Sequence, residues 1–457
     1  MGTRAITRPE RQAPGPRGLP LLGNLDVFRS PDPLAEMTAL QRQYGNLVRL
    51  TFGPRVVHLL FGAGEFKHVL QDNNRNYIKG RTFDKTKPLL GEGLLTSEGE
   101  FWRRQRRLIQ PMFNRQRIGS FLPVMVAVVE EMLGRWRRFP PGEVVDISRE
   151  MARLTLEIIS RVMFSTGLTP DEADTVSQVM PELMRETNRR ISSLTGLRER
   201  LPLPAVIRYR RSIQALEQIL YRLIEERRRS GEDHPDLLGM LLAAREAGQA
   251  AMSDRQIRDE LMTIFLAGHE TTAALMDWTL VLLSRHPESR RRLQVEVDRV
   301  LGGRTPDLAD LEQLTYTFNV LQESLRLYPP AWALARQAIG QDEIDGYTIP
   351  AGSGMVLVPL VAHHSPEYWD NPEGFDPDRF EPDRSAGRPA YAFIPFGGGP
   401  RLCLGNNFAL QEATIALAMI AQQAELDLAP GCPVTAMNDF TLRPAQGIWM
   451  RLRWRAL

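Results

Sequence analysis

The 457-residue chain has very little cysteine, since only Cys403 and Cys432 occur. Two cysteines are too few for the disulfide framework of a small secreted domain, and no CxxC pair of the kind that binds zinc is present. A chain with so few cysteines fits a reducing compartment. The sequence therefore predicts a cytoplasmic protein.

Long apolar runs are also missing. The longest, 121–129 and 355–362, fall short of the roughly 18 residues that a membrane-spanning helix needs. The first twenty residues hold four arginines and no apolar block, unlike a secretory signal. We expect a protein without a membrane anchor.

Neither positive nor negative charge predominates in the chain as a whole, because the net charge is only +2. A balance this close to zero argues against nucleic acid as a partner. Lysine is rare, and 53 of the 57 basic residues are arginine, a bias that we attribute to a GC-rich, bacterial genome. The segment 101–117 holds six arginines and no acid. Taken alone, it indicates a solvated helix face.

The composition, with 43% hydrophobic and 25% charged residues, is that of a globular protein with a large core. A Pro/Gly-rich lead-in covers residues 1–24, and no later segment has the composition of a linker, so we expect one domain over 25–457. Helical periodicity dominates 121–335, and one more helix is expected after Gly405. Short strands are expected near 46–52, 56–61 and 347–360. The sequence thus predicts a mainly α fold with a small β portion.

One helix dominates the middle of the chain. Ser253 and Gln256 form a capping-box pattern, and the next firm stop is His286 before a proline, which gives about 33 residues and a length of about 50 Å. Its centre, AGHETT, places Glu270 and Thr271 between apolar flanks. The pair is either an exposed part of a solvated face or a buried acid and hydroxyl that transfer protons.

Two further motifs carry chemistry. In ESLR, Glu323 and Arg326 share one helical face and can pair, although such pairs are commonly weak surface contacts. In FGGGPRLCLG, residues 396–405, Cys403 follows three consecutive glycines. Glycine is costly to order, so this run indicates a backbone that something approaches closely.

Together these motifs identify a family. FGGGPRLCLG matches FxxGxRxCxG, and AGHETT, ESLR and FDPDRF at 375–380 stand in the order and at about the separations found in cytochromes P-450. The likeness covers essentially the whole chain. The sequence resembles a soluble, bacterial cytochrome P-450, a haem-thiolate monooxygenase. This implies a single mainly α domain with haem between the long central helix and the cysteine loop and its following helix.

The resemblance also implies roles for residues. Cys403 would be the metal ligand, the axial thiolate of haem b (iron protoporphyrin IX), and the helix after it would tune the sulfur. The implied cofactor-binding residues are Trp102, Arg106, Arg336, Phe396, Arg401, Cys403 and Gly405, with His363 near the propionates. The implied structural ion-pair network consists of Glu323, Arg326 and Arg379. The implied pocket residues are Ala267, Trp332, Ala333, Leu334 and Thr441.

In this family, residues matching Glu270 and Thr271 form an acid–alcohol pair that delivers protons during the reduction of dioxygen. The reaction implied is RH + O2 + 2 e⁻ + 2 H⁺ giving ROH and water, by hydroxylation or epoxidation. The chain has no dinucleotide-binding or iron–sulfur motif, so a ferredoxin or flavodoxin with its reductase would supply the electrons. The arginines of 101–117 would then divide between haem propionates and that acidic partner.

The substrate class stays open at this point. The apolar segment AWALA at 331–335 suits a hydrophobic small molecule of secondary metabolism: a terpenoid, fatty acyl, polyketide or steroid-like compound. We expect a monomer. Two alternatives remain, a peroxide-driven or isomerising haem-thiolate enzyme and a non-catalytic haem-binding sensor.

Overall fold

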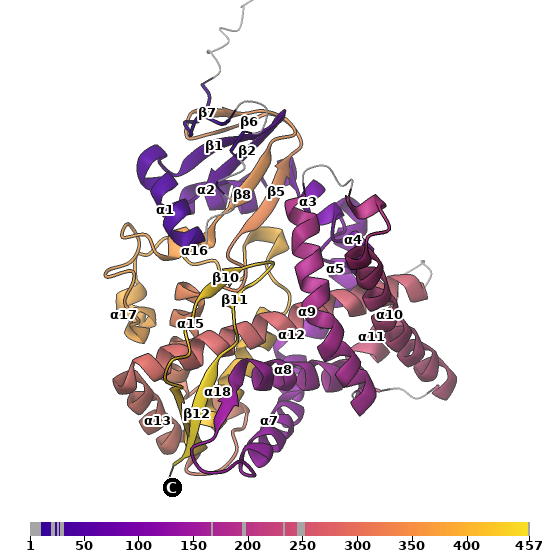
Figure 1. Ribbon diagram of the computed structural model, residues 1–457, viewed down its shortest axis with the longest axis vertical. Helices are drawn as coiled ribbons and strands as arrows, with labels where there is room; N and C mark the ends of the chain where they lie inside the picture. Colours follow the sequence, from indigo (N-terminus) through magenta and orange to yellow (C-terminus); the bar gives the residue numbers. More distant parts are fainter. Residues whose placement is uncertain are drawn as a thin grey trace, which may run out of the picture. The chain divides into compact units, whose positions relative to one another are not determined.

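Helices dominate the computed structural model, which describes residues 11–19, 23–24, 27, 32–165, 168–193, 198–231, 234–244 and 252–455 (Figure 1). The chain groups into two compact units. The first contains Met1–Arg81, Trp332–Glu373 and Gly387–Cys403, and the second contains Thr82–Ala331, Gly374–Ala386 and Leu404–Leu457. A single domain over 25–457 stays a prediction, and part of the lead-in 1–24 lies outside the described residues.

The first unit is built around a five-stranded sheet of order β1-β2-β8-β5-β3. Its strands are β1 (Leu47–Phe52), β2 (Arg55–Leu60), β3 (Tyr77–Ile78), β5 (Leu334–Ala338) and β8 (Gly354–Leu357), with a separate β6–β7 hairpin (Asp342–Ile344 and Tyr347–Ile349). Its helices are α1 (Pro33–Tyr44), α2 (Ala63–Lys67) and α16 (Pro359–His363). Buried Leu60, Phe66, Leu70 and Leu357 belong to its core. The strands predicted near 46–52, 56–61 and 347–360 are confirmed.

The second unit is mainly helical. Its longer helices are α5 (Gly99–Ile109), α7 (Leu122–Trp136), α8 (Ile147–Phe164), α9 (Pro170–Ser192), α10 (Pro204–Ser230), α12 (Asp254–Arg285), α13 (Pro287–Leu301), α15 (Thr315–Leu327) and α18 (Asn406–Gln423). Shorter helices are α4 (Lys87–Leu90), α6 (Arg115–Ser120), α11 (Leu237–Ala243), α14 (Leu308–Leu311) and α17 (Pro382–Ser385), while α3 (Arg81–Asp84) lies at the boundary of the two units. Its strands are β4 (Val144–Asp146), β9 (Ala424–Leu428), β10 (Ala436–Asn438), β11 (Leu442–Pro444) and β12 (Trp449–Trp454). A sheet of order β4-β12-β9 and a β10–β11 hairpin complete it.

The predicted central helix is confirmed as α12, which has 32 residues and the expected capping box between Ser253 and Gln256. It crosses the helical unit and packs on α8 (Figure 1). A Cβ at Gly268 would lie 3.0 Å from Ile159 Cδ1 of α8, so glycine lets the two helices approach closely. Close packing on α8 therefore fixes the position of the centre of α12 within this unit.

The segment 101–117 is not one helix. It forms α5, a 3₁₀ turn at Gln110–Phe113 and the start of α6. Pro111 has no N–H to continue the helical hydrogen bonds, and the side chain of Asn114 caps the next helix by accepting from the N–H of Arg117. The strand β4, inside the predicted helical stretch, is also absent from the sequence prediction.

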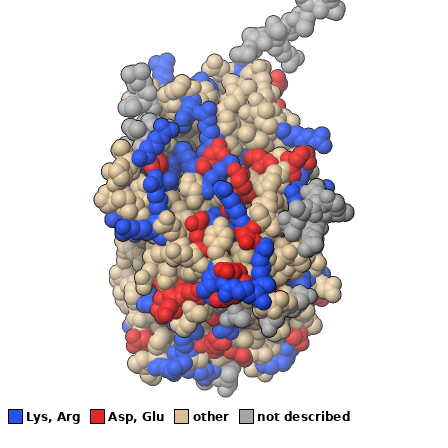
Figure 2. All heavy atoms as spheres, turned by 90° about the vertical axis from the view of Figure 1, so that its right-hand side faces the viewer, with Lys and Arg blue, Asp and Glu red and all other residues tan. Residues whose placement is uncertain are grey.

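Charged side chains on the surface are largely interleaved by sign. On the face shown in Figure 2, Lys and Arg side chains lie next to Asp and Glu side chains. Arg222, for example, bonds both Glu172 and Glu226. In the described part of the chain, no helix combines the length and the apolar composition that crossing a bilayer requires.

Candidate active site

The cysteine loop belongs to the first unit and presents its sulfur. Neither Cys403 nor Cys432 forms a disulfide, and Cys403 is exposed. The N–H of Cys403 donates to the carbonyl oxygen of Phe396 at 3.0 Å, which closes the loop. An accessible thiol held by a backbone hydrogen bond is a suitable ligand for a soft metal centre.

The glycines of this loop are required by its own packing. Gly399 has φ +63°, and a Cβ there would lie 1.8 Å from the carbonyl oxygen of Leu70. A Cβ at Gly398 would lie 2.7 Å from the ring of Tyr391, whose hydroxyl donates to Gln71 at 2.6 Å. The glycine run therefore seats the loop on residues 70–71, in addition to any approach by a cofactor.

Other predicted residues of the first unit lie on β5 and beside the loop. Arg336 is buried in β5, and its guanidinium donates to the carbonyl of Ala335 at 2.8 Å. The side chain of Leu334 comes close to the loop, since a Cβ at Gly397 would lie 3.7 Å from its Cδ1. The half-buried residues are Trp332, Ala333, Phe396 and Arg401. His363 is fully buried, and its Nε2 accepts the N–H of Ile394 at 3.0 Å.

In the second unit, the helix predicted after the cysteine is confirmed. α18 begins at Asn406 with Gly405 as its N-cap, and no side chain caps it. Its first N–H groups therefore have no side-chain acceptor within the helix cap, and their partial positive charge favours an anion. Trp102 and Arg106 lie one turn apart on α5, and both are half-buried.

The centre of α12 has one open face. Most of the helix between Ile257 and Leu283 is buried, but Ala267 is exposed, and Glu270 and Thr271 are half-buried. Residues three and four apart share a helical face, so these positions form one strip. The burial pattern favours the second of the two interpretations of AGHETT, an acid and a hydroxyl set in an apolar helix beside an open space.

Glu270 is held by a strand from the end of the chain. The hydroxyl of Thr441 donates to Glu270 Oε1 at 2.9 Å, and Arg443 Nε lies 3.9 Å from the same oxygen. Arg443 in turn pairs with Asp439 at 3.1 Å. Burial raises the pKa of Glu270, while the Thr441 hydrogen bond and the charge of Arg443 oppose that rise. Thr441, expected to line a pocket, is therefore a direct partner of Glu270.

Thr271 and His269 take different roles. The hydroxyl of Thr271 donates to the carbonyl of Ala267 at 2.6 Å, one turn earlier in α12. Because this bond uses the hydroxyl hydrogen, the Thr271 oxygen can still accept a hydrogen bond at the open face. His269 is buried, and burial lowers its pKa to about 4, so it is a neutral core residue near pH 7.

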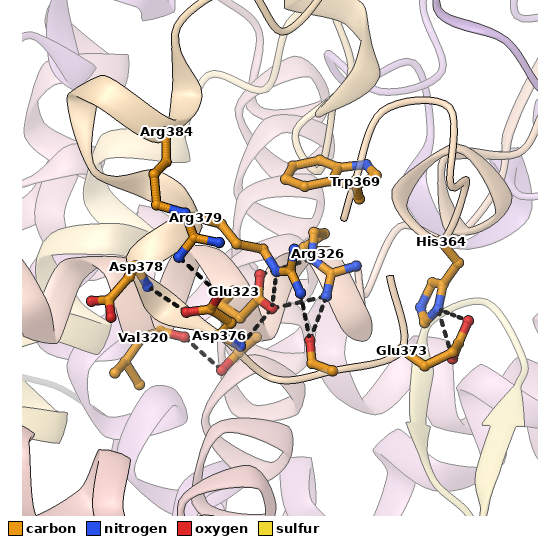
Figure 3. Close-up of polar contacts among 12 residues, drawn as sticks. Val320, Glu323, Arg326, His364, Trp369, Glu373, Asp376, Asp378, Arg379 and Arg384 are labelled. Carbon is orange, nitrogen blue, oxygen red and sulfur yellow. Dashed lines mark hydrogen bonds and ion pairs between the residues drawn. The ribbon is translucent and has the colours of Figure 1, made fainter. Parts of the chain in front are cut away.

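The ESLR pair is part of a buried network, not a surface contact (Figure 3). Glu323 and Arg326 are fully buried and Arg379 nearly so. Arg326 donates to both carboxylate oxygens of Glu323 at 2.7 and 2.8 Å, and Arg379 Nε donates to Oε1 at 3.2 Å. Oε1 also accepts the N–H of Asp376 at 2.9 Å, which ties α15 to the segment 374–380. The three predicted residues are thus brought together.

The described residues fit a haem. Cys403 supplies the one accessible sulfur inside the recognised motif, on a loop that glycine keeps free of side chains. In the same unit, Arg336 and Arg401 are cationic groups of the kind that would pair with the carboxylates of such a cofactor, while Trp102 and Arg106 belong to the second unit. Cys403 belongs to the first unit, whereas Glu270 and Thr271 belong to the second.

Sequence reasoning missed Arg443 and Asp439, which surround Glu270, and Asp277, a buried acid on α12. Arg443 carries no local signal, because its pairing with Glu270 depends on the position of β11 beside α12. Asp277 does carry one: it is an acid within the apolar run ALMDWTLVLL, seven residues after Glu270.

Comparison with known proteins agrees with these features. The family model described as Cytochrome P450 matches residues 13–450. Cyclooctatin synthase of Streptomyces melanosporofaciens is 38% identical over 95% of this chain and 94% of its own length. Pentalenene oxygenase of Streptomyces avermitilis is 34% identical over 96% and 97%, respectively. The crystal structure of the cytochrome P450DA heme domain superposes with a TM-score of 0.89, at 28% identity and 98% coverage of both chains.

Proposed function

Because the chain belongs to the cytochrome P450 family and is a haem-thiolate monooxygenase, we propose that it oxidises a terpenoid with electrons from a separate carrier. The substrate class rests on relatives covering nearly the whole chain. Their printed names include pentalenene oxygenase and, at 36% identity over 93% of this chain, cyclooctat-9-en-7-ol 5-monooxygenase. Terpenoid skeletons of this kind suit the small, apolar segment 331–335.

The cysteine loop would hold the cofactor. Cys403 would bind haem iron through its thiolate, and the N–H groups at the start of α18 would stabilise the negative charge on that sulfur. Trp102, Arg106 and Arg401 would pair with the propionates. When bound, haem supplies the iron at which dioxygen is activated, so that one oxygen atom enters the substrate and the other leaves as water.

The centre of α12 would supply protons to that chemistry. Glu270 is half-buried, and burial raises the pKa of its carboxyl, which favours a protonated acid that can pass its proton on. Thr271, one residue on, offers a hydroxyl on the same open face. This acid–alcohol pair is the observation that favours oxygen-dependent monooxygenation over isomerisation or sensing, neither of which consumes protons.

We further propose that the electron donor is a ferredoxin or flavodoxin, reduced by its own reductase. The exposed arginines of α5 and α6, Arg103, Arg107 and Arg115, would offer cationic groups to an acidic carrier, which would compete with Glu100 for Arg103 and with Glu312 for Arg115. Association driven by charge weakens as salt screens it. Electron transfer from such a carrier is therefore expected to slow at high ionic strength.

The decisive experiment on the cofactor is the carbon monoxide difference spectrum of the reduced protein. A thiolate-bound haem gives a strongly red-shifted Soret band, and Cys403→His should abolish it, whereas Cys432→Ala, which changes the other free cysteine, should leave it intact. A wild-type spectrum typical of histidine-ligated haem would refute the assignment.

The substrate class is tested by titrating the oxidised protein with terpenoid hydrocarbons and alcohols, and with fatty acids, macrolides and steroids as competitors. Displacement of water from the haem by a bound substrate shifts the Soret band, and mass spectrometry of a reconstituted turnover then identifies the product. We expect spectral binding and a gain of one oxygen atom with a terpenoid. Turnover of only a fatty acid or steroid would overturn the substrate proposal, and product formation without oxygen uptake would overturn the reaction.

A further inference from the structure

A second acid lies buried on the face of α12 that carries Glu270. Asp277 follows Glu270 by seven residues, two helical turns and about 10 Å along the axis. It is only 5% exposed, and its Oδ1 makes no hydrogen bond to any described residue. Between the two acids, α12 places only Ala273 and Ala274 on this face. A buried acid with an open oxygen needs a physical reason.

Asp277 has a short connection to solvent. Its Oδ2 accepts a hydrogen bond from the hydroxyl of Ser148 at 2.8 Å. Ser148 stands in the first turn of α8, next to the N-cap Asp146, and both residues are partly exposed. Gly447 faces these two residues: a Cβ at Gly447 would lie 3.5 Å from Asp146 Oδ1 and 3.9 Å from Ser148 Oγ. The backbone at Gly447 therefore lies beside Asp146 and Ser148, and an alanine Cβ would make only ordinary contact there.

Asp277 is also linked to the surroundings of Glu270. The indole N–H of Trp278 donates to the carbonyl of Leu442 at 3.1 Å, which fixes β11 beside this part of α12. The next residue, Arg443, ion-pairs with Glu270 and lowers the pKa of both Glu270 and Asp277 by its charge. One guanidinium thus acts on both carboxyl groups.

We propose that Ser148 and Asp277 form the solvent end of a proton path that reloads Glu270, which makes Asp277 a further residue of proton delivery. The proposal rests on the proposed function, because only an oxygen-reducing enzyme needs two protons in each turnover. It adds the residues through which solvent supplies them.

The complete sequence of proton transfers returns every group of the path to its starting state. Asp277 would give its proton to water bound between the two acids, and a chain of such waters would pass a proton to the carboxylate of Glu270. The Ser148 hydroxyl then gives its proton to the Asp277 carboxylate and takes one from a solvent water. No electron moves along the path, since the separate carrier supplies both electrons directly to the cofactor.

The charges around Asp277 set the pH range of this transfer. Burial, with the negative charge of Asp146, raises the pKa of Asp277 to about 8 against the opposing effects of the Ser148 hydrogen bond and the charge of Arg443. Asp277 is therefore protonated, and able to donate, below about pH 8. Above that pH it becomes an anion, and delivery along this path is expected to fail.

The first test needs no turnover. Infrared difference spectra of the holoenzyme below and above pH 8 should contain the C=O band of a buried carboxylic acid that is lost on raising the pH, and Asp277→Asn should remove it. The matched control is Glu260→Gln, which changes another buried acid of α12. Burial raises the pKa of Glu260 to about 8, and its carboxylate accepts the N–H of Leu94, away from this path. This control should remove its own band and leave that of Asp277. An unchanged carboxyl band in Asp277→Asn would overturn the proposal.

The second test measures coupling. Asp277→Asn is expected to lower the fraction of electrons recovered in product about tenfold. This is less than the roughly 10²–10⁴-fold loss expected for a group that acts on the reacting atoms. The same variant is expected to raise peroxide release and the solvent isotope effect. Ser148→Ala, at a partly exposed position, should shift the same three quantities in the same direction without risk to folding. Glu260→Gln should shift none of them.

The outcomes separate the two proposals. If the wild type shows no oxygen-dependent product, the proposed function fails. If the wild type is coupled and both Asp277→Asn and Ser148→Ala keep its coupling, isotope effect and pH profile, the proton path fails while the function stands. Loss of stability in Asp277→Asn with wild-type coupling in Ser148→Ala would assign Asp277 a structural role and also overturn the path.

Discussion

Substitution of Glu323 by glutamine tests the buried ion-pair network. One carboxylate accepts four hydrogen bonds: two from Arg326, one from Arg379 and one from the N–H of Asp376, at 2.7 to 3.2 Å. Glutamine keeps the shape but removes the negative charge, so two guanidinium groups lose a buried counter-charge. Breaking a buried pair in this way costs about 3–5 kcal/mol.

The assay is urea unfolding of the purified holoenzyme, followed by tryptophan fluorescence and by the Soret band. We expect Glu323→Gln to unfold at a clearly lower urea concentration and to release haem in the same transition. The loss of haem follows because Glu323 fixes the segment 374–380, which precedes the cysteine loop in the chain.

The matched control is Glu225→Gln. Glu225 pairs with Arg229 one turn away, but both side chains are about two-thirds exposed, at 65% and 69%. Exposed pairs of this kind contribute under about 1 kcal/mol. If Glu323→Gln unfolds at the same urea concentration as Glu225→Gln, the charge of Glu323 does not hold this network together and the reasoning is wrong.

Three further predictions follow from single contacts. Gly399→Ala should fold poorly and bind little haem, because its Cβ would lie 1.8 Å from the Leu70 carbonyl oxygen, whereas Gly387→Ala, also at positive φ but with nothing within 4 Å, should cost only about 1–2 kcal/mol of urea stability. Burial raises the pKa of Glu260 to about 8, so the folded state holds a proton that the unfolded state releases above its usual pKa. Stability should therefore fall as pH rises toward 8, by on the order of a few kcal/mol, and Glu260→Gln should flatten urea midpoints measured across this range; an unchanged slope would contradict the burial argument. Thr271→Ala should keep the carbon monoxide spectrum but divert electrons into peroxide, measured as peroxide per electron consumed, and wild-type coupling would contradict a role in proton delivery.

Local patterns predicted the elements whose causes are local. The capping box at Ser253 and the proline after His286 define α12 to within one residue, because both signals act through neighbouring backbone groups. The break at Pro111 was equally readable, but the six arginines of 101–117 suggested a continuous helix. Charge composition says little about where backbone hydrogen bonds stop.

The site was predictable where a motif fixes it and not where tertiary packing does. Cys403 and Glu323 stand in recognisable patterns, and the family resemblance supplied Arg379 as a partner from far along the chain. The contacts of Glu270 with Thr441 and Arg443 depend on a strand about 170 residues away whose register no local signal records. Gly399 was explained by a cofactor alone, because the carbonyl of Leu70 beneath it is invisible in sequence.

The cysteine loop proposed to bind the cofactor and the acids proposed to deliver protons belong to different compact units, so experiments can test them separately. Cys403 and its glycines pack within the first unit, whereas Glu270, Asp277 and their partners pack within the second. A change confined to the cysteine should therefore leave the carboxyl groups as they are. Cys403→His is expected to lose the thiolate spectrum yet keep the infrared band of Asp277, while Asp277→Asn is expected to do the reverse. Loss of both signals in either variant would mean that the cofactor ligand and the proton path depend on one another, and their treatment as independent sites would be wrong.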